Sequence, residues 1–197
     1  MSDERAELPL PDFASWPIFP FVGDMRVRPA EPRRPADGPR SGEPGGGPCR
    51  SCAESDERCI WVDDHWRVLA PERRSAVPVQ LFLETREHVD MDGLSPELAA
   101  ELGLLIVRLD RAMQAIGGVG RVHMSRWGDG ASHFHLWFYA RPLGDVQMLG
   151  FCLPMWAEIL PPTAEDVWNH NLRIVARELA RGGGRVIAGS GSPPAER

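Results

Sequence analysis

Two short motifs carry the residue types best suited to chemistry. Cys49 and Cys52 form a Cys-x-x-Cys knuckle, and His133 and His135 form a His-x-His pair. Thiolates and imidazoles bind zinc, and a neutral imidazole is also a competent nucleophile at neutral pH. A tetrahedral zinc site that uses the knuckle needs two further ligands. The candidates are the six histidines of the chain, at positions 65, 88, 123, 133, 135 and 170.

The segment that contains the histidine pair has the pattern of a β-strand with two different faces. Side chains alternate across a strand. One face therefore holds His133, His135, Trp137 and Tyr139, and the other holds Phe134, Leu136 and Phe138. We expect the second face to pack in the core. The first face collects groups that can ligate, attack or donate a hydrogen bond; the alternative interpretation is a solvated sheet face that carries two histidines.

The surrounding elements predict an α+β fold. Ser95 and Pro96 are typical of a helix N-cap followed by proline at the first helical position. Five strands that are mostly adjacent in sequence favour an antiparallel sheet covered by helix on one face. The expected elements are strands at 60–62, 66–69 and 77–83, a long amphipathic helix at 95–116, strands at 121–127 and 133–141, and a C-terminal helix at 167–179.

Composition divides the chain into four segments. Residues 1–25 form an apolar, proline-rich N-terminal arm, which we expect to dock on the body or on a partner subunit. Residues 26–48 hold six prolines, five glycines and five arginines, which is typical of an extended linker. Residues 49–181 form the central domain, and residues 182–197 are expected to be a disordered tail.

Length, charge and hydropathy exclude several classes of protein. A chain of 197 residues has room for one ordinary domain. A net charge of -6 argues against a sequence-independent nucleic-acid binder, which needs a basic surface. The chain has no apolar stretch long enough for a membrane helix, and its polar N-terminus lacks the pattern of a secretory signal. We therefore expect a cytoplasmic protein with reduced thiols, in which Cys59 and Cys152 are buried apolar residues.

Several of these features, taken in order along the chain, resemble the histidine-triad (HIT) superfamily. The resemblance covers roughly residues 49–160. It includes the cysteine knuckle, the strand followed by Arg86-Glu87-His88-Val89 and a long helix, and the segment from Gly130 to Trp137. It is closest to the zinc-bearing branches, which include galactose-phosphate uridylyltransferases and diadenosine-polyphosphate hydrolases and phosphorylases. The fold implied is a HIT-like antiparallel sheet of about five strands, with a long helix after the third strand.

The resemblance implies a metal site and a nucleophile. In the zinc-bearing relatives, two cysteines, a histidine before the long helix and the first motif histidine hold the metal. The corresponding residues here are Cys49, Cys52, His88 and His133, a closed structural zinc site. The middle histidine of the motif attacks phosphorus and carries the nucleotidyl group, and that position is His135. Sequence does not show which carbonyl orients its ring.

The chain departs from the family pattern at the third motif position. Trp137 stands where a full triad has histidine and where the uridylyltransferase branch has glutamine. An indole N–H donates a hydrogen bond to a phosphate oxygen but cannot shuttle a proton. Leaving groups of low pKa, such as a nucleotide or pyrophosphate, are therefore favoured over an amine.

The phosphate-binding loop of the family is also matched only loosely. Gly128, Gly130 and Ser132 are the candidates for contacts to phosphate, and Ser132 joins His135 and Trp137 in the predicted catalytic set. Arg126 and Arg141 are candidates for positive charge near the phosphate oxygens. The alternative for both arginines is an ordinary solvated position at a strand end.

These expectations combine into one leading function and two alternatives. The first is a nucleotide phosphoanhydride hydrolase or nucleotidyltransferase that works through a covalent nucleotidyl-His135 and takes a nucleotide or nucleotide-sugar substrate. The second is a catalytically silent, zinc-containing nucleotide-binding protein. A third, a redox protein that uses the Cys49–Cys52 pair, requires a thioredoxin-like βαβ pattern that the sequence lacks. The resemblance also implies a homodimer, whose interface the N-terminal arm could extend.

Overall fold

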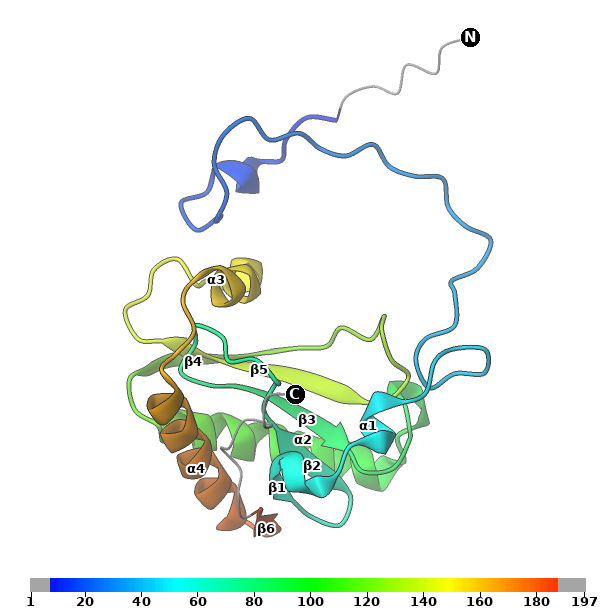
Figure 1. The fold of residues 1–197 in the computed structure, drawn as a ribbon, viewed down its shortest axis with the longest axis vertical. Coiled ribbons are helices and arrows are strands. Elements are labelled where there is room, and N and C mark those ends of the chain that lie inside the picture. Colours follow the sequence, from blue (N-terminus) through cyan, green and yellow to red (C-terminus); the bar gives the residue numbers. More distant parts are fainter. Residues whose placement is uncertain (1–7, 188–197) are drawn as a thin grey trace, which may run out of the picture.

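A six-stranded antiparallel sheet forms the centre of the computed structural model, which describes residues 8–187 (Figure 1). The strand order across the sheet is β4-β5-β3-β2-β1-β6. The fold class predicted from the sequence is confirmed, with one strand more than expected. The strands are β1 (Cys59–Val62), β2 (Trp66–Leu69), β3 (Gln80–Thr85), β4 (Val119–Ser125), β5 (His135–Pro142) and β6 (Arg185–Val186).

Two long helices cover one face of this sheet. Helix α2 (Pro96–Gln114) begins where the sequence predicts, because the Ser95 hydroxyl accepts a hydrogen bond from the Leu98 N–H (3.2 Å). Helix α4 (Glu165–Ala180) packs beside α2. Their apolar faces enclose the main core with the inward-facing residues of the strands. The sheet contributes, among others, Trp66, Val68, Leu81, Leu83, Leu136 and Phe138.

The opposite face of the sheet is only partly covered. Helix α3 (Leu153–Ile159) lies over the end that carries Tyr139, and this corrects the expectation of helices on one face alone. In Figure 1, α3 lies on the other side of the sheet from α2. The short helix α1 (Arg50–Ala53) lies near the far end of the same open face. The motif residues lie on the stretch between these two helices.

The register of the sheet places the histidine motif beside β3. Glu84 pairs with His135, and Phe82 pairs with Trp137. The regular strand begins at His135, two residues later than expected, because residues 126–134 form an irregular loop. His133 therefore belongs to the loop that precedes β5. Its Phe134 neighbour still donates a main-chain hydrogen bond to Val89 (2.7 Å).

The N-terminal arm contacts α3, in line with the expectation that it docks. Phe13 packs against Phe151 with ring centroids 5.4 Å apart, and the indole N–H of Trp156 donates to the main-chain oxygen of Ile18 (2.7 Å). The blue segment in Figure 1 lies above α3 for this reason. The boundaries assigned to arm, linker and domain remain predictions.

Residues at the C-terminal end of the described chain differ from the sequence-based expectation. We expected disorder from residue 182, but Arg185–Val186 forms β6 and pairs with Trp61 and Val62 of β1. Ile187 is buried beside this pair, and burial of that side chain explains the order. The rest of the expected tail, residues 188–197, lies outside the described residues. Within residues 8–187, no helix is long and apolar enough to cross a membrane.

Candidate functional site

The four predicted metal ligands lie together at one end of the sheet. The ligand atoms of Cys49, Cys52, His88 and His133 all lie within 4.8 Å of one another. The Cys52 sulfur is 3.3 Å from Nδ1 of His88 and 3.6 Å from Nδ1 of His133, and the Cys49 sulfur is 3.5 Å from Nδ1 of His133. A tetrahedron built on ordinary zinc–sulfur and zinc–nitrogen bonds has S···N edges of about 3.6 Å. The donor set and its spacing therefore fit zinc.

Local hydrogen bonds orient the candidate ligand side chains toward a common point. Cys49 caps α1, so that its sulfur accepts from the Cys52 N–H (3.4 Å) and the two thiols face the same side. The Nε2–H of His133 donates to the main-chain oxygen of Thr85 (2.8 Å). That bond assigns the proton to Nε2 and leaves the Nδ1 lone pair directed at the thiols, the arrangement that metal-bound histidines use. Thr85 is a supporting residue that sequence reasoning missed.

Ser132, a candidate for contacts to phosphate, contacts His88, which is a candidate metal ligand. Its hydroxyl lies 3.4 Å from Nε2 of His88 and donates to the main-chain oxygen of Ser41 (3.2 Å). The Nδ1 atom of His88 is thereby left for the metal site. The structure thus places Ser132 behind His88 and not beside His135.

The last part of the predicted linker closes the metal site. Gly42 has a φ angle of +92°, and a Cβ atom there would lie 2.7 Å from Cε1 of His88 and 2.8 Å from the Ser132 hydroxyl. Only glycine fits both the backbone conformation and the space. A Pro/Gly-rich composition hid this role, because the same residues that make a flexible linker also make tight turns.

A buried arginine joins α1 to the sheet. The Arg67 guanidinium pairs with Glu84 (3.0 Å) and donates to the main-chain oxygens of Ser51 and Glu54, the latter at 3.4 Å. Those carbonyls lie at the C-terminal end of α1, where the Ser51 oxygen also accepts from the Glu54 N–H (3.3 Å). Arg67 therefore fixes the helix that carries Cys52 on the open face of the sheet.

Burial sets the protonation tendencies of the ligands. Partial desolvation, together with a hydrogen bond to Cys49, raises the pKa of the Cys52 thiol to about 11. Burial also lowers the pKa of His133, which keeps this imidazole neutral and able to ligate. A divalent cation would supply the positive charge that two thiolates need in this position.

His135 is held at the edge of the metal site with a fixed ring orientation. Its Nδ1 atom lies 2.8 Å from the main-chain oxygen of His133, which accepts a hydrogen bond from it. This is the orienting carbonyl that sequence could not identify. The Nε2 atom points to the loop and lies 3.0 Å from the main-chain oxygen of Trp127.

Trp137 is part of an aromatic cluster. Its ring lies 4.4 Å from Phe82, 5.6 Å from Trp127 and 6.2 Å from Tyr139, measured between centroids. Its indole N–H is buried and has no hydrogen-bond partner within the described part of the chain. The neighbouring rings, rather than a phosphate oxygen, occupy the surroundings of Trp137 in this conformation.

The predicted phosphate ligands are not all brought to His135. Arg126 lies beside the site, but its guanidinium is paired with Asp90 (2.6 Å). Gly130 lies in the same loop and accepts a main-chain hydrogen bond from Ser41 (3.1 Å). Arg141 lies six residues along β5 from His135, about 20 Å away at ~3.4 Å per residue. Its guanidinium donates to the main-chain oxygen of Asp145 (2.8 Å). Arg141 therefore lies outside the site, because the length of β5 separates it from His135.

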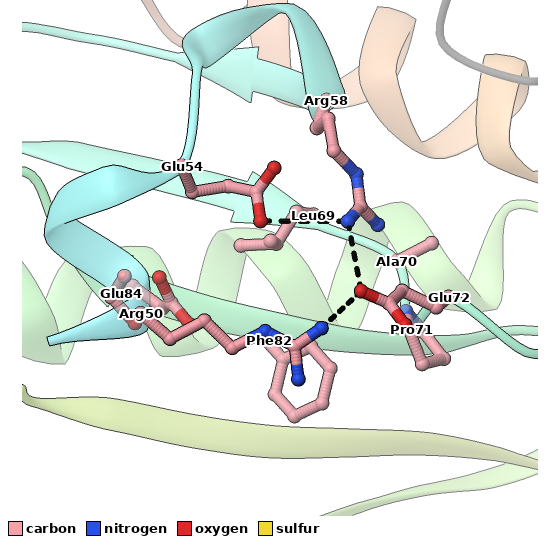
Figure 2. A pocket seen from close by; sticks show the side chains of 10 residues that line it. Arg50, Glu54, Arg58, Leu69, Ala70, Pro71, Glu72, Phe82 and Glu84 are labelled. Carbon is pink, nitrogen blue, oxygen red and sulfur yellow. Dashed lines mark hydrogen bonds and ion pairs between the residues drawn. The ribbon is translucent and has the colours of Figure 1, made fainter. Parts of the chain in front are cut away.

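A pocket of about 280 Å³ opens on the same face of the sheet, beneath α1 (Figure 2). Leu69, Pro71 and Phe82 form its apolar part. Figure 2 shows Arg58 bonded to Glu54 (3.4 Å) and Glu72 (3.3 Å) at its rim. Arg50 also pairs with Glu72 there.

The pocket is adjacent to the histidine strand. Glu84 lines the pocket and is the direct cross-strand neighbour of His135. Phe82, which also lines it, packs against Trp137. A ligand in the pocket would therefore lie one strand away from the His135 imidazole.

Comparison with solved structures identifies the fold. A histidine triad protein from Bradyrhizobium japonicum is similar at 20% identity over 61% of this chain and 89% of that chain, with a TM-score of 0.50. A zinc-bound histidine triad family protein from Mycobacterium smegmatis is 21% identical over 63% and 86%, with a TM-score of 0.45. A uridylyltransferase is 18% identical over 66% of this chain and 44% of its own length, with a TM-score of 0.47.

No family model and no curated protein matches the sequence. The structural comparison nevertheless supports the resemblance to the HIT superfamily at the level of the fold. The chain has the histidine-triad fold, with a cysteine and histidine cluster that is compatible with zinc.

Proposed function

We propose that this chain is a nucleotide phosphoanhydride hydrolase or nucleotidyltransferase that works through a covalent nucleotidyl-His135. The observation that carries the proposal is the hydrogen bond of 2.8 Å from His135 Nδ1 to the His133 main-chain oxygen. In the tautomer with the ring proton on Nδ1, this bond orients the ring and Nε2 is the atom with a lone pair for attack. The fold and the adjacent pocket support the same function.

In the proposed first step, Nε2 of His135 attacks the α-phosphorus of a nucleotide. An N–P bond forms, and the P–O bond to the leaving phosphate breaks with its electron pair on that oxygen. In the second step, a water molecule or another acceptor hydroxyl attacks the same phosphorus and loses its proton, and the N–P bond breaks to restore the imidazole. Trp137 cannot donate a proton to the leaving oxygen, so phosphate leaving groups of low pKa are favoured.

The pocket of about 280 Å³ is the proposed site for the nucleoside. Phe82 and Leu69 offer an apolar surface for a base, while Arg50 and Glu72 offer polar groups at the rim. A nucleoside bound there would direct its α-phosphate toward the strand that holds His135.

Zinc has a structural role in this proposal. Cys49, Cys52, His88 and His133 would complete a four-coordinate site with no position left for substrate. The metal would tie α1 to the start of β5, and thereby fix the His133 carbonyl that orients His135. A homodimer remains a prediction from the resemblance.

The test compares turnover by three proteins. Wild type, His135→Ala and His170→Ala are incubated with dinucleoside polyphosphates and with nucleotide sugars, and released nucleotides are quantified. His170 is an exposed histidine on α4 and serves as the matched control. We expect loss of the nucleophile to reduce turnover at least about a hundredfold, with His170→Ala unchanged. Equal rates for wild type and His135→Ala would reject the enzymatic proposal.

The second candidate is a silent nucleotide-binding protein. The observation that favours it is the buried, unpartnered indole N–H of Trp137 at the position of the third motif histidine. This candidate predicts that nucleotide binds, as measured by calorimetry, while no nucleotide is released by wild type or by His135→Ala.

A further inference from the structure

The loop before β5 occupies the position from which His135 would attack. A reacting phosphorus must approach within about 3–3.5 Å of the attacking atom. The Trp127 main-chain oxygen already lies 3.0 Å from Nε2 of His135. Both ring nitrogens therefore face main-chain oxygens, which only accept hydrogen bonds, because the His133 oxygen lies 2.8 Å from Nδ1. Phosphorus and the Trp127 carbonyl cannot occupy this place together.

The side chain of the same residue covers the neighbouring surface. The Trp127 ring meets the edges of Trp137 and Tyr139, with centroids 5.6 Å and 6.4 Å away. Trp127 itself is 44% exposed, so this contact lies at the surface and is not part of the main core. The loop therefore covers both the nucleophile and the aromatic cluster beside it.

An arginine from the linker holds the loop in this conformation. Arg40 donates to the main-chain oxygen of Gly128 (2.9 Å) and pairs with Asp90 (2.7 Å). Asp90 also pairs with Arg126 (2.6 Å) at the start of the loop. Glu43 holds the Arg40 guanidinium from the other side (2.6 Å). The carboxylate of Asp90 thus connects the linker to the residue that precedes Trp127.

Main-chain bonds add a second attachment at the far end of the loop. The Ser41 N–H donates to Gly130 (3.1 Å), and the Ser132 N–H donates to Ser41 (3.0 Å). Ser41 and Ala131 consequently form an isolated parallel bridge. Residues 40 and 41 are therefore attached to both ends of the segment that covers His135.

We propose that residues 126–132 form an autoinhibitory gate over His135, and that Arg40 is the positioning residue that latches it closed. This inference rests on the proposed function, because a gate matters only where Nε2 must meet a substrate. Movement of the N-terminal linker releases Gly128 and Asp90 and withdraws the Trp127 carbonyl from the imidazole.

The experiment measures access to the His135 imidazole without relying on turnover. Zinc-loaded full-length wild type, Arg40→Ala and Arg34→Ala are treated with diethyl pyrocarbonate, and carbethoxylation of His135 is followed by peptide mass spectrometry relative to His170. Arg34 is an exposed arginine of the same linker, with no ion pair or hydrogen bond recorded in residues 8–187. We expect Arg40→Ala to accelerate modification of His135 about fivefold, because charge-assisted contacts of the loop are lost. Arg34→Ala should match wild type.

A second variant distinguishes release of the loop from misfolding of the protein. Asp90→Asn keeps a side-chain oxygen for the Met91 N–H, to which Asp90 is now bonded (2.7 Å), but weakens both arginine contacts. It should accelerate modification of His135 as Arg40→Ala does, with zinc content unchanged. Equal modification rates in wild type and both variants would overturn the gate. Faster modification without turnover in any variant would uphold the gate and reject the enzymatic function, so the two failures are distinguishable.

Discussion

Arg67 and Glu84 form a buried ion pair, 3.0 Å long, in the middle of the open sheet face. The pair lies between the two parts of the candidate site. Glu84 is the cross-strand neighbour of His135, and Arg67 holds the main-chain oxygen of Ser51 beside the cysteine knuckle. The same arginine therefore supports both the cysteine and histidine cluster and the strand that carries His135.

Arg67→Met is expected to destabilise the protein by about 3 kcal/mol, because it leaves the Glu84 carboxylate buried without its cation. Urea unfolding of the zinc-loaded protein measures the change. The double variant Arg67→Met/Glu84→Leu should recover at least about 1 kcal/mol of this loss, since the uncompensated charge is gone. The exposed Arg73→Met variant is the control, and a loss as large as that of Arg67→Met would contradict the assignment.

Gly42→Ala should weaken the metal site. A methyl group at this φ of +92° meets His88 and the Ser132 hydroxyl at less than 3 Å. We expect a cost of about 2 kcal/mol, seen as weaker zinc retention in competition with a chelator. Gly38→Ala is the matched control in the same linker, because a Cβ there meets nothing within 4 Å. Equal zinc retention by the two variants would show that the turn at Gly42 does not close the site.

Removal of a knuckle thiol should remove the metal. Cys52→Ser replaces a proposed ligand, and Cys152→Ser changes a buried cysteine far from the cluster. Metal analysis should find about one zinc per chain in wild type and in Cys152→Ser, and almost none in Cys52→Ser. Zinc retained at the wild-type level in Cys52→Ser would remove this residue from the ligand set.

The exposed His65–Glu101 pair predicts a shallow pH dependence of stability. The hydrogen bond and charge of Glu101 raise the pKa of His65 above 6.5, and the hydrogen bond from His65 lowers the pKa of Glu101 below 4.5. The stabilisation by His65 is complete below pH 6.5 and is lost as the pH rises through its folded-state pKa. The stabilisation by Glu101 is complete above pH 4.5 and is lost as the pH falls through its folded-state pKa.

The pair therefore contributes most between these two pH values. Urea unfolding of wild type and His65→Asn at pH 5.5 and pH 9 measures the effect. The difference between the two proteins should be larger at pH 5.5. A difference that grows toward pH 9 would contradict the direction assigned to the His65 pKa.

Sequence patterns were sufficient to predict the elements whose boundaries depend on residues that are close together in the sequence. Ser95 and Pro96 marked the start of α2 because capping depends on a few neighbouring residues. Helix α4 has no such local signal, because its N-cap residue is Ala164 and the neighbouring Thr163 hydroxyl donates to the Val77 carbonyl instead of capping the helix. A tertiary contact replaced the local one, and sequence alone does not reveal such a choice.

The candidate site could be predicted from the sequence only in part. The residue types left the cysteine knuckle and six histidines as candidates, and the resemblance to zinc-bearing relatives selected Cys49, Cys52, His88 and His133, which the structure brings together. The residues that support them did not stand out. Arg40 and Gly42 lie in a segment whose composition predicts a linker, and the contacts of Arg40 with Asp90 and Gly128 and of Gly42 with His88 span more than forty residues of sequence.

The most direct test of the central claim is the search for a covalent nucleotide on His135. Wild type and His135→Ala are mixed with a dinucleoside polyphosphate, quenched within seconds and examined by intact-mass and peptide mass spectrometry. The predicted result is a nucleotidyl mass increment that maps to His135 in wild type and is absent from His135→Ala. Turnover without any such increment, or an increment that maps to another residue, would contradict it.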